Sequence, residues 1–189
     1  MNMHPPLFNR QKNWRQKDPL AFTLIELLVV IAIITILMGL IFPAATSAIY
    51  SARKTTAKNQ AVQIATALTA YETEYGQLPT NSGSNVGVAL VNILTANDTN
   101  NNPRALNFLD TSAWKLGKGG TNSSGYCDPF GSNNVYSVSL DTNYSNILTN
   151  MPYQASPGGT ISTTNITKHI GVWTVSTNRS QTNLIDSWE

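Results

Sequence analysis

Few residues of this chain have the chemistry to act on a bound substrate. The sequence contains one cysteine, Cys127, and two histidines, His4 and His169. A single cysteine excludes a disulfide within the chain and a zinc site built from several thiolates. The sequence has no phosphate-binding loop, nucleophile elbow or zinc-protease motif, and no triad motif surrounds His169. We therefore expect a protein that is not an enzyme.

One acidic segment carries oxygen-bearing side chains at alternating positions, as at the start of a calcium-binding loop. It reads Asp141-Thr142-Asn143-Tyr144-Ser145. An EF-hand loop also needs glycine at its sixth position and glutamate at its twelfth, where this chain has Asn146 and Pro152. The segment therefore favours a solvated turn at the end of a strand, and we expect no metal and no other cofactor.

The most unusual carboxylate is Glu26, the single charged residue within the apolar segment Phe22–Phe42. A helix needs about 20 apolar residues to cross the hydrocarbon core of a membrane, so this segment predicts one transmembrane helix. A carboxylate there is costly unless it lies at the interface or has a partner. Two interpretations stay open: Glu26 lies at headgroup depth near the positive end of the helix dipole, or it pairs with a cation.

A basic leader precedes the apolar segment. Residues 1–21 have a net charge of +3, whereas residues 22–189 have a net charge of −1. This distribution favours an N-terminus in the cytoplasm, and the overall charge of +2 gives no indication of nucleic-acid binding. A secretory signal cleaved after Ala48 is a competing interpretation. Glu26 and an apolar region longer than the usual span of about 7–15 residues speak against it.

The junction between leader and apolar segment resembles the class III signal of type IV prepilins. It reads Ala21-Phe22-Thr23-Leu24-Ile25-Glu26-Leu27, with Ala21 where the family usually has glycine. The resemblance implies that a prepilin peptidase cuts between Ala21 and Phe22 and methylates the new amine of Phe22. It also implies that Glu26 pairs with the Phe22 amine of a neighbouring subunit, which stabilises both charges and sets the register between subunits.

Helical signals continue beyond the apolar segment. Ile64, Leu68, Tyr71 and Tyr75 recur on one face of a helix, and Gly76 marks its end. The sequence therefore predicts a helical spine over residues 22–75, with a transmembrane part over 22–42 and an amphipathic part after it.

Gly39 and Pro43 interrupt the predicted spine. Pro43 has no N–H to donate to the carbonyl of Gly39, and glycine lowers helix stability further. We expect a kink here. Whether the segment simply bends or loosens when the subunit leaves the bilayer stays open, and the second interpretation comes from the family resemblance.

The composition after the spine shifts toward asparagine, serine, threonine and glycine, and the residues predict an α+β head domain over 76–189. A short helix is expected within 85–95, and a helix or turn over 103–110 that docks Leu106, Phe108 and Leu109. Segments 135–140, 160–167 and 170–176 are strand candidates. Three short strands after a helix indicate a small antiparallel sheet packed on the spine.

The head also resembles that of the major pseudopilins of type II secretion systems. Asp128, Pro129, Phe130 and Gly131 form a turn signal similar to an Asp-Pro-Trp-Gly sequence of that family, and Trp188 matches a late tryptophan. The family binds calcium in the intervening loop. Here the expected ligand positions hold Asn178, Asn183 and Leu184, and Asp186 is the remaining carboxylate, so we expect weak binding at most.

The resemblance implies a structural subunit that polymerises into a periplasmic pseudopilus and drives protein export. Its implied partners are further copies of the chain, prepilin peptidase, an inner-membrane assembly platform and minor pseudopilins. It would be a single-pass inner-membrane protein with the head in the periplasm. The alternatives are a type IV pilin of a surface filament, major or minor, and a membrane-tethered module that binds an envelope polymer. Glu26 separates the filament subunits from the tether, because a tether needs no carboxylate there.

Overall fold

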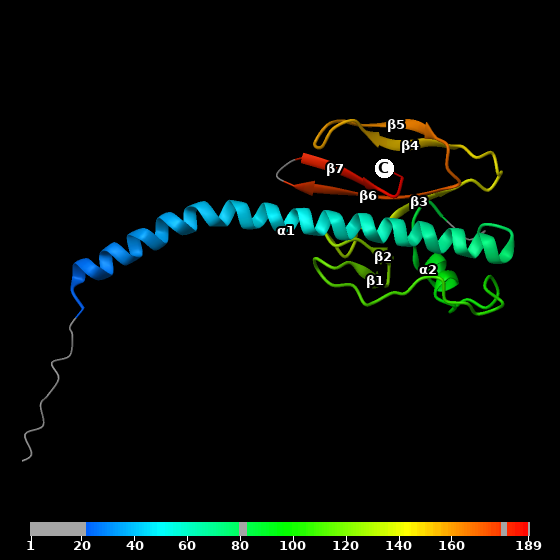
Figure 1. Ribbon diagram of the computed structural model, residues 1–189. Helices are drawn as coiled ribbons and strands as arrows, with labels where there is room; N and C mark the ends of the chain where they lie inside the picture. The colour runs from blue at the N-terminus through cyan, green and yellow to red at the C-terminus, as the bar shows by residue number, and fades with distance from the viewer. Residues whose placement is uncertain (1–21, 80–82, 179–180, 189) are drawn as a thin grey trace, which may run out of the picture. The chain divides into compact units, whose positions relative to one another are not determined.

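The computed structural model describes residues 22–79, 83–178 and 181–188. The chain divides into two compact units, Met1–Ala44 and Ala45–Glu189. The leader 1–21, which includes Ala21, lies outside the described residues. One long helix followed by antiparallel strands gives the α+β architecture that the sequence predicts (Figure 1).

Helix α1 spans Leu24–Tyr75 and begins in the first unit. All described residues of that unit are exposed, which agrees with an apolar pattern that has no buried face. Within the second unit, α1 buries Ile64, Leu68 and Tyr71 on one side, as the helical spacing predicts. The helix ends where expected, because Gly76 adopts a positive φ of 69° and donates its N–H to the carbonyl of Glu72 at 2.8 Å.

The hydroxyl groups of several threonines of α1 form hydrogen bonds with backbone carbonyls of the same helix. Each donates a hydrogen bond to the carbonyl four residues earlier, at 2.7–3.1 Å. These residues are Thr35, Thr55, Thr56, Thr66, Thr69 and Thr73. These hydroxyl groups therefore have a hydrogen-bond partner within the helix itself.

The described residues of the head form a second helix and seven strands. Helix α2 spans Val88–Leu94, within the segment predicted to be helical. The strands are β1 (Gly120–Asn122), β2 (Gly125–Cys127), β3 (Ser137–Leu140), β4 (Leu148–Gln154), β5 (Ile161–Ile166), β6 (Ile170–Asn178) and β7 (Gln181–Asp186). They form a β1–β2 hairpin, a three-stranded sheet in the order β3-β6-β7, and a β4–β5 hairpin, all antiparallel.

Two of the three predicted strands belong to the same sheet in the structure. Segments 135–140 and 170–176 pair as β3 and β6, but segment 160–167 becomes β5 and pairs with β4 instead. The third strand of the sheet is β7, which the resemblance to pseudopilins assigned to a loop. Segment 103–110 is irregular; it buries Leu109 and partly buries Phe108, while Leu106 is 37% exposed, so the expectation that Leu106 docks is wrong.

The core of the head joins α1, α2 and the three-stranded sheet. Ile64 and Leu68 of α1 lie in one buried cluster with Leu90 of α2, Val138 of β3 and Val172 of β6. Burial of this kind contributes about 25 cal/mol for each Å² of apolar surface. The amphipathic part of α1 is therefore an integral element of the head.

Candidate assembly site

The first turn of α1 is closed by a reciprocal pair of hydrogen bonds between Thr23 and Glu26. The Thr23 backbone N–H donates to Glu26 Oε2 at 2.8 Å, and the Glu26 N–H donates to Thr23 Oγ1 at 3.3 Å. The Thr23 hydroxyl also donates to the same carboxylate oxygen, at 2.7 Å. This is a capping box, in which a threonine and a glutamate three residues later satisfy the first N–H groups of a helix.

The capping box assigns Glu26 a structural role that the sequence analysis missed. The signal was present, because Thr23-Leu24-Ile25-Glu26 has the spacing of a capping box directly before an apolar run. The backbone N–H and the hydroxyl of Thr23 both donate to Oε2, and within the described residues Oε1 accepts no hydrogen bond. The carboxylate thus retains an oxygen for a partner from outside the described chain.

Glu26 lies at the start of the exposed apolar part of α1. Its large apolar residues from Leu24 to Phe42 are 45–81% exposed, and the Phe22 side chain just before the helix is 74% exposed. This helix is long and apolar enough to span a membrane (Figure 1). A contiguous exposed apolar surface of this kind marks a site of contact with lipid or with other protein, because removing apolar surface from water is favourable.

The predicted kink residues lie within unbroken helix. Pro43 lies inside α1. A Cβ added to Gly39 would have no heavy atom of the described residues within 4 Å apart from the backbone of its own helix. The missing N–H of Pro43 nevertheless removes the hydrogen bond that would reach the Gly39 carbonyl. A locally weaker helix at Gly39 and Pro43 therefore stays a prediction.

The turn at Asp128 is held by its buried side chain. Asp128 Oδ1 accepts the backbone N–H groups of Phe130 and Gly131 at 2.8 and 3.1 Å. Its Oδ2 accepts the hydroxyl of Thr174, on β6, at 2.6 Å. The Pro129 carbonyl accepts a further N–H from outside the turn. The Asp128-Pro129-Phe130-Gly131 landmark is thus a turn anchored to the central strand of the sheet.

Trp188 packs near the same strand. Its ring lies 6.0 Å from that of Trp173, edge to face, and the Trp188 backbone N–H donates to Asp186 Oδ1 at 3.2 Å. Trp173 and Thr174 are neighbours on β6 and point to opposite faces of the sheet. The two sequence landmarks of the head, Asp128 and Trp188, are therefore attached to adjacent residues of one strand.

Burial raises the pKa of the Asp128 carboxyl, against the lowering effect of its hydrogen bonds. Because the pKa of Asp128 is higher in the folded than in the unfolded protein, its contribution to the free energy of unfolding is greatest below the unfolded-state pKa. This contribution is lost as pH rises through the folded-state pKa. We expect Asp128→Asn to lower the free energy of unfolding by about 2 kcal/mol, because the amide places an NH2 group where Oδ2 accepts the Thr174 hydroxyl. We also expect the difference in free energy of unfolding between the wild type and this variant to be largest at acid pH.

Denaturant unfolding of both proteins between acid and neutral pH measures this difference. The sign of its change with pH is the decisive result. A difference that widens as pH rises would show that the Asp128 carboxyl is not the group whose pKa burial raises.

The residues expected near a calcium loop lie in strands. Asn183, Leu184 and Asp186 belong to β7, and Asn178 is the last residue of β6. The Asn183 amide donates to Tyr50 Oη at 3.0 Å, so it serves contacts within the head. No cluster of three or more histidine, cysteine or acidic side chains occurs among the residues that the structure describes.

Asp141 closes a turn and is almost fully buried, so the expectation of a solvated segment is wrong for this side chain. Its carboxylate accepts the Asn146 N–H at 2.6 Å and the Ser145 hydroxyl at 3.1 Å, and His169 Nδ1 lies 3.5 Å away. These hydrogen bonds hold the pKa of Asp141 below its usual value although desolvation opposes them. The carboxylate oxygens of Asp141 therefore stabilise the turn through hydrogen bonds within the segment.

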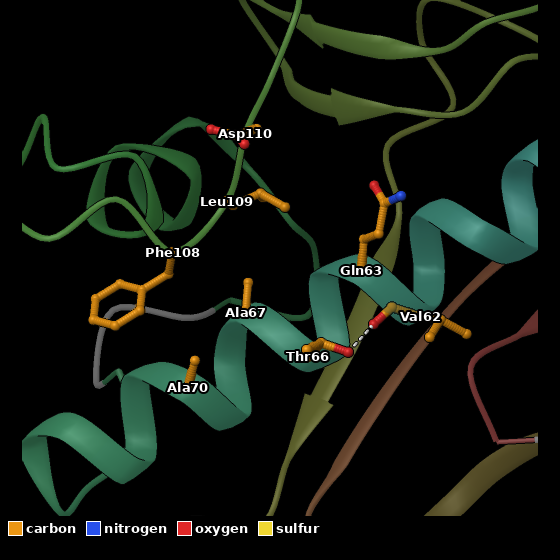
Figure 2. A pocket seen from close by; sticks show the side chains of 8 residues that line it. All are labelled: Val62, Gln63, Thr66, Ala67, Ala70, Phe108, Leu109 and Asp110. Carbon is orange, nitrogen blue, oxygen red and sulfur yellow. Dashed lines mark hydrogen bonds between the residues drawn. The ribbon is translucent and has the colours of Figure 1, made fainter.

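A groove of about 390 Å³ lies between α1 and segment 108–110 of the head. Figure 2 shows Phe108 and Leu109 facing Ala67 and Ala70 across it, with Asp110 as the one carboxylate. The Thr66 hydroxyl is bonded to the Val62 carbonyl at 2.8 Å. The groove therefore combines no nucleophile with a base and does not resemble a catalytic site.

No protein-family model, curated protein or solved structure matches the chain. The candidate site consequently rests on the residues themselves. The structure brings Phe22, Thr23 and Glu26 together at the start of α1, and joins Asp128 and Trp188 through β6.

Proposed function

We propose that the chain is a structural subunit of a type II secretion pseudopilus. It enters the membrane as a single-pass precursor, is cut before Phe22 and methylated there, and polymerises through its apolar helix. The filament drives protein export with energy from a partner ATPase. The chain itself has no phosphate-binding motif.

The exposed apolar helix with one carboxylate in its first turn carries this proposal. Glu26 is capped by Thr23 through one oxygen, which fixes the side chain and leaves Oε1 for another partner. Cleavage before Phe22 would create an amine four residues before Glu26 in each subunit. In a bundle of such helices, the amine of one subunit and the Glu26 of the next would neutralise each other away from water.

Processing at Phe22 is the first expected result. Protein recovered from cells that also express a prepilin peptidase is expected to begin at Phe22 and to be heavier by one methyl group. Cells without the peptidase are expected to retain the leader. N-terminal sequencing and intact mass measure both. Because the family usually has glycine before the cut, Ala21→Gly is expected to be processed faster than the wild type.

Other N-termini support other functions. A start at Ile49 would indicate a secreted domain released by an ordinary signal peptidase. An uncut chain in the presence of active peptidase would support a membrane-tethered binding module. A start at Phe22 with filaments outside the cell, and not in the periplasm, would favour a type IV pilin.

A further inference from the structure

The three-stranded sheet of the head has both outer edges covered. Beside β3, the Val138 N–H donates to the Ser84 carbonyl at 2.9 Å. Beside β7, the amide of Gln154 donates to the Thr182 carbonyl and accepts the Leu184 N–H, both at 2.7 Å. The Gln154 side chain thus imitates a neighbouring strand. Covered edges of this kind prevent unwanted pairing with other chains.

Strand β5 differs from these strands. Within the described residues it pairs with β4 alone, and Figure 1 shows it as the outermost strand of its part of the head. Its four central side chains, Ser162 to Asn165, are all exposed. Ile161–Ile166 contains no charged residue and no proline, which are the usual protections of an open edge.

Pro152 determines which backbone groups of β5 face outward. Pro152 lies directly opposite Thr163 in the antiparallel pair. Residues that face each other in such a pair either exchange two hydrogen bonds or direct both of their N–H and C=O groups away from each other. Proline has no N–H to exchange, so this pair is of the second kind. The N–H and C=O of Thr163 therefore point to the open edge.

We propose that the open edge of β5 binds the same edge of a second copy of this chain. An antiparallel pair about a two-fold axis places Thr163 opposite its own counterpart, so that the two residues exchange both backbone hydrogen bonds. The same register places Ser162 opposite Thr164 of the second copy. The absence of charge lets an identical edge pair without repulsion, and threonine and serine side chains form favourable cross-strand pairs. This interface involves the heads alone and does not depend on the proposed function.

Cross-linking of Thr163→Cys tests the register. At the two-fold axis the two Cα atoms lie about 5.5 Å apart, within the range of a disulfide. Ser162→Cys is the matched control, because its two copies lie about two residues apart along the strands and not opposite each other. We expect oxidation of the full-length chain in detergent to link Thr163→Cys at least about ten-fold faster than Ser162→Cys. The native Cys127 is fully buried, and the wild-type chain measures its background.

A charge at the centre of the edge tests the association itself. Thr163→Lys puts two like charges opposite each other, and we expect it to weaken dimerisation about ten-fold or more. Thr142→Lys makes the same substitution at an exposed residue outside β5 and is expected to leave dimerisation unchanged. Sedimentation velocity of the full-length chain in detergent measures both, and circular dichroism checks that both variants fold. Equal association of the two lysine variants, or equal cross-linking of the two cysteine variants, would overturn the proposal.

Discussion

Glu26→Gln is expected to prevent filament assembly while the protein still enters the membrane. Glutamine keeps the capping box, because its amide oxygen can accept the Thr23 N–H and hydroxyl as Glu26 Oε2 does. It removes the charge that would neutralise the Phe22 amine of the next subunit. The loss of one partner from a buried ion pair costs about 3 kcal/mol or more, which corresponds to about 100-fold in the assembly equilibrium.

Thr23→Ala is the matched control for this variant. It removes the hydroxyl from the capping box but keeps the carboxylate, and a lost N-cap costs about 1 kcal/mol. We therefore expect Thr23→Ala to assemble far better than Glu26→Gln. Sheared or periplasmic filaments, compared with the membrane-bound chain by immunoblot, measure assembly and insertion separately. Normal filaments from Glu26→Gln would reduce Glu26 to a helix cap and remove the main support for the pseudopilus.

Gly125→Ala is expected to destabilise the head by about 3 kcal/mol. Gly125 has a φ of 133°, which side chains other than glycine rarely adopt. A Cβ on this residue would collide with the Val86 carbonyl and lie 2.7 Å from Gly87 Cα. These are backbone atoms of the segment that pairs with β2, so they cannot move without loss of the pairing.

Gly83→Ala is a suitable comparison, because no heavy atom of the described residues lies within 4 Å of a Cβ there and φ is outside the left-handed region. We expect it to change stability by less than about 0.5 kcal/mol. Thermal and denaturant unfolding of the full-length chain in detergent measure both variants. Equal stability of the two would mean that the segment around Val86 and Gly87 yields more easily than its backbone contacts indicate.

The sequence predicts the helical part of the fold well because helical spacing is a local signal. Ile64, Leu68 and Tyr71 repeat at helical intervals, and the positive φ of Gly76 ends the helix as expected. Strand β4 was not predicted, since Pro152 argues against a strand. In the structure, Pro152 occupies a position of β4 whose backbone N–H would point away from β5, so the pairing of the two strands loses no hydrogen bond.

Long-range contacts explain the remaining differences. The resemblance to pseudopilins assigned segment 181–186 to a loop, yet it becomes β7 because β6 and the Gln154 side chain satisfy its two edges. Asp128 was identified as part of a turn, but its bond to Thr174 joins residues far apart in sequence. At the candidate assembly site, the sequence identifies Phe22 and Glu26, while the role of Thr23 becomes clear from the hydrogen bonds of the first turn.

The hydrogen bonds between threonine hydroxyls and carbonyls within α1 lower the free-energy cost of removing water from the surface of the helix. A hydroxyl that leaves water without a partner costs about 1–3 kcal/mol. The hydroxyls of Thr55, Thr66, Thr69 and Thr73 already have a carbonyl partner within the helix, so dehydration of this face removes little hydrogen bonding. Another protein surface or lipid can therefore cover these threonines without leaving their hydroxyl groups unpaired.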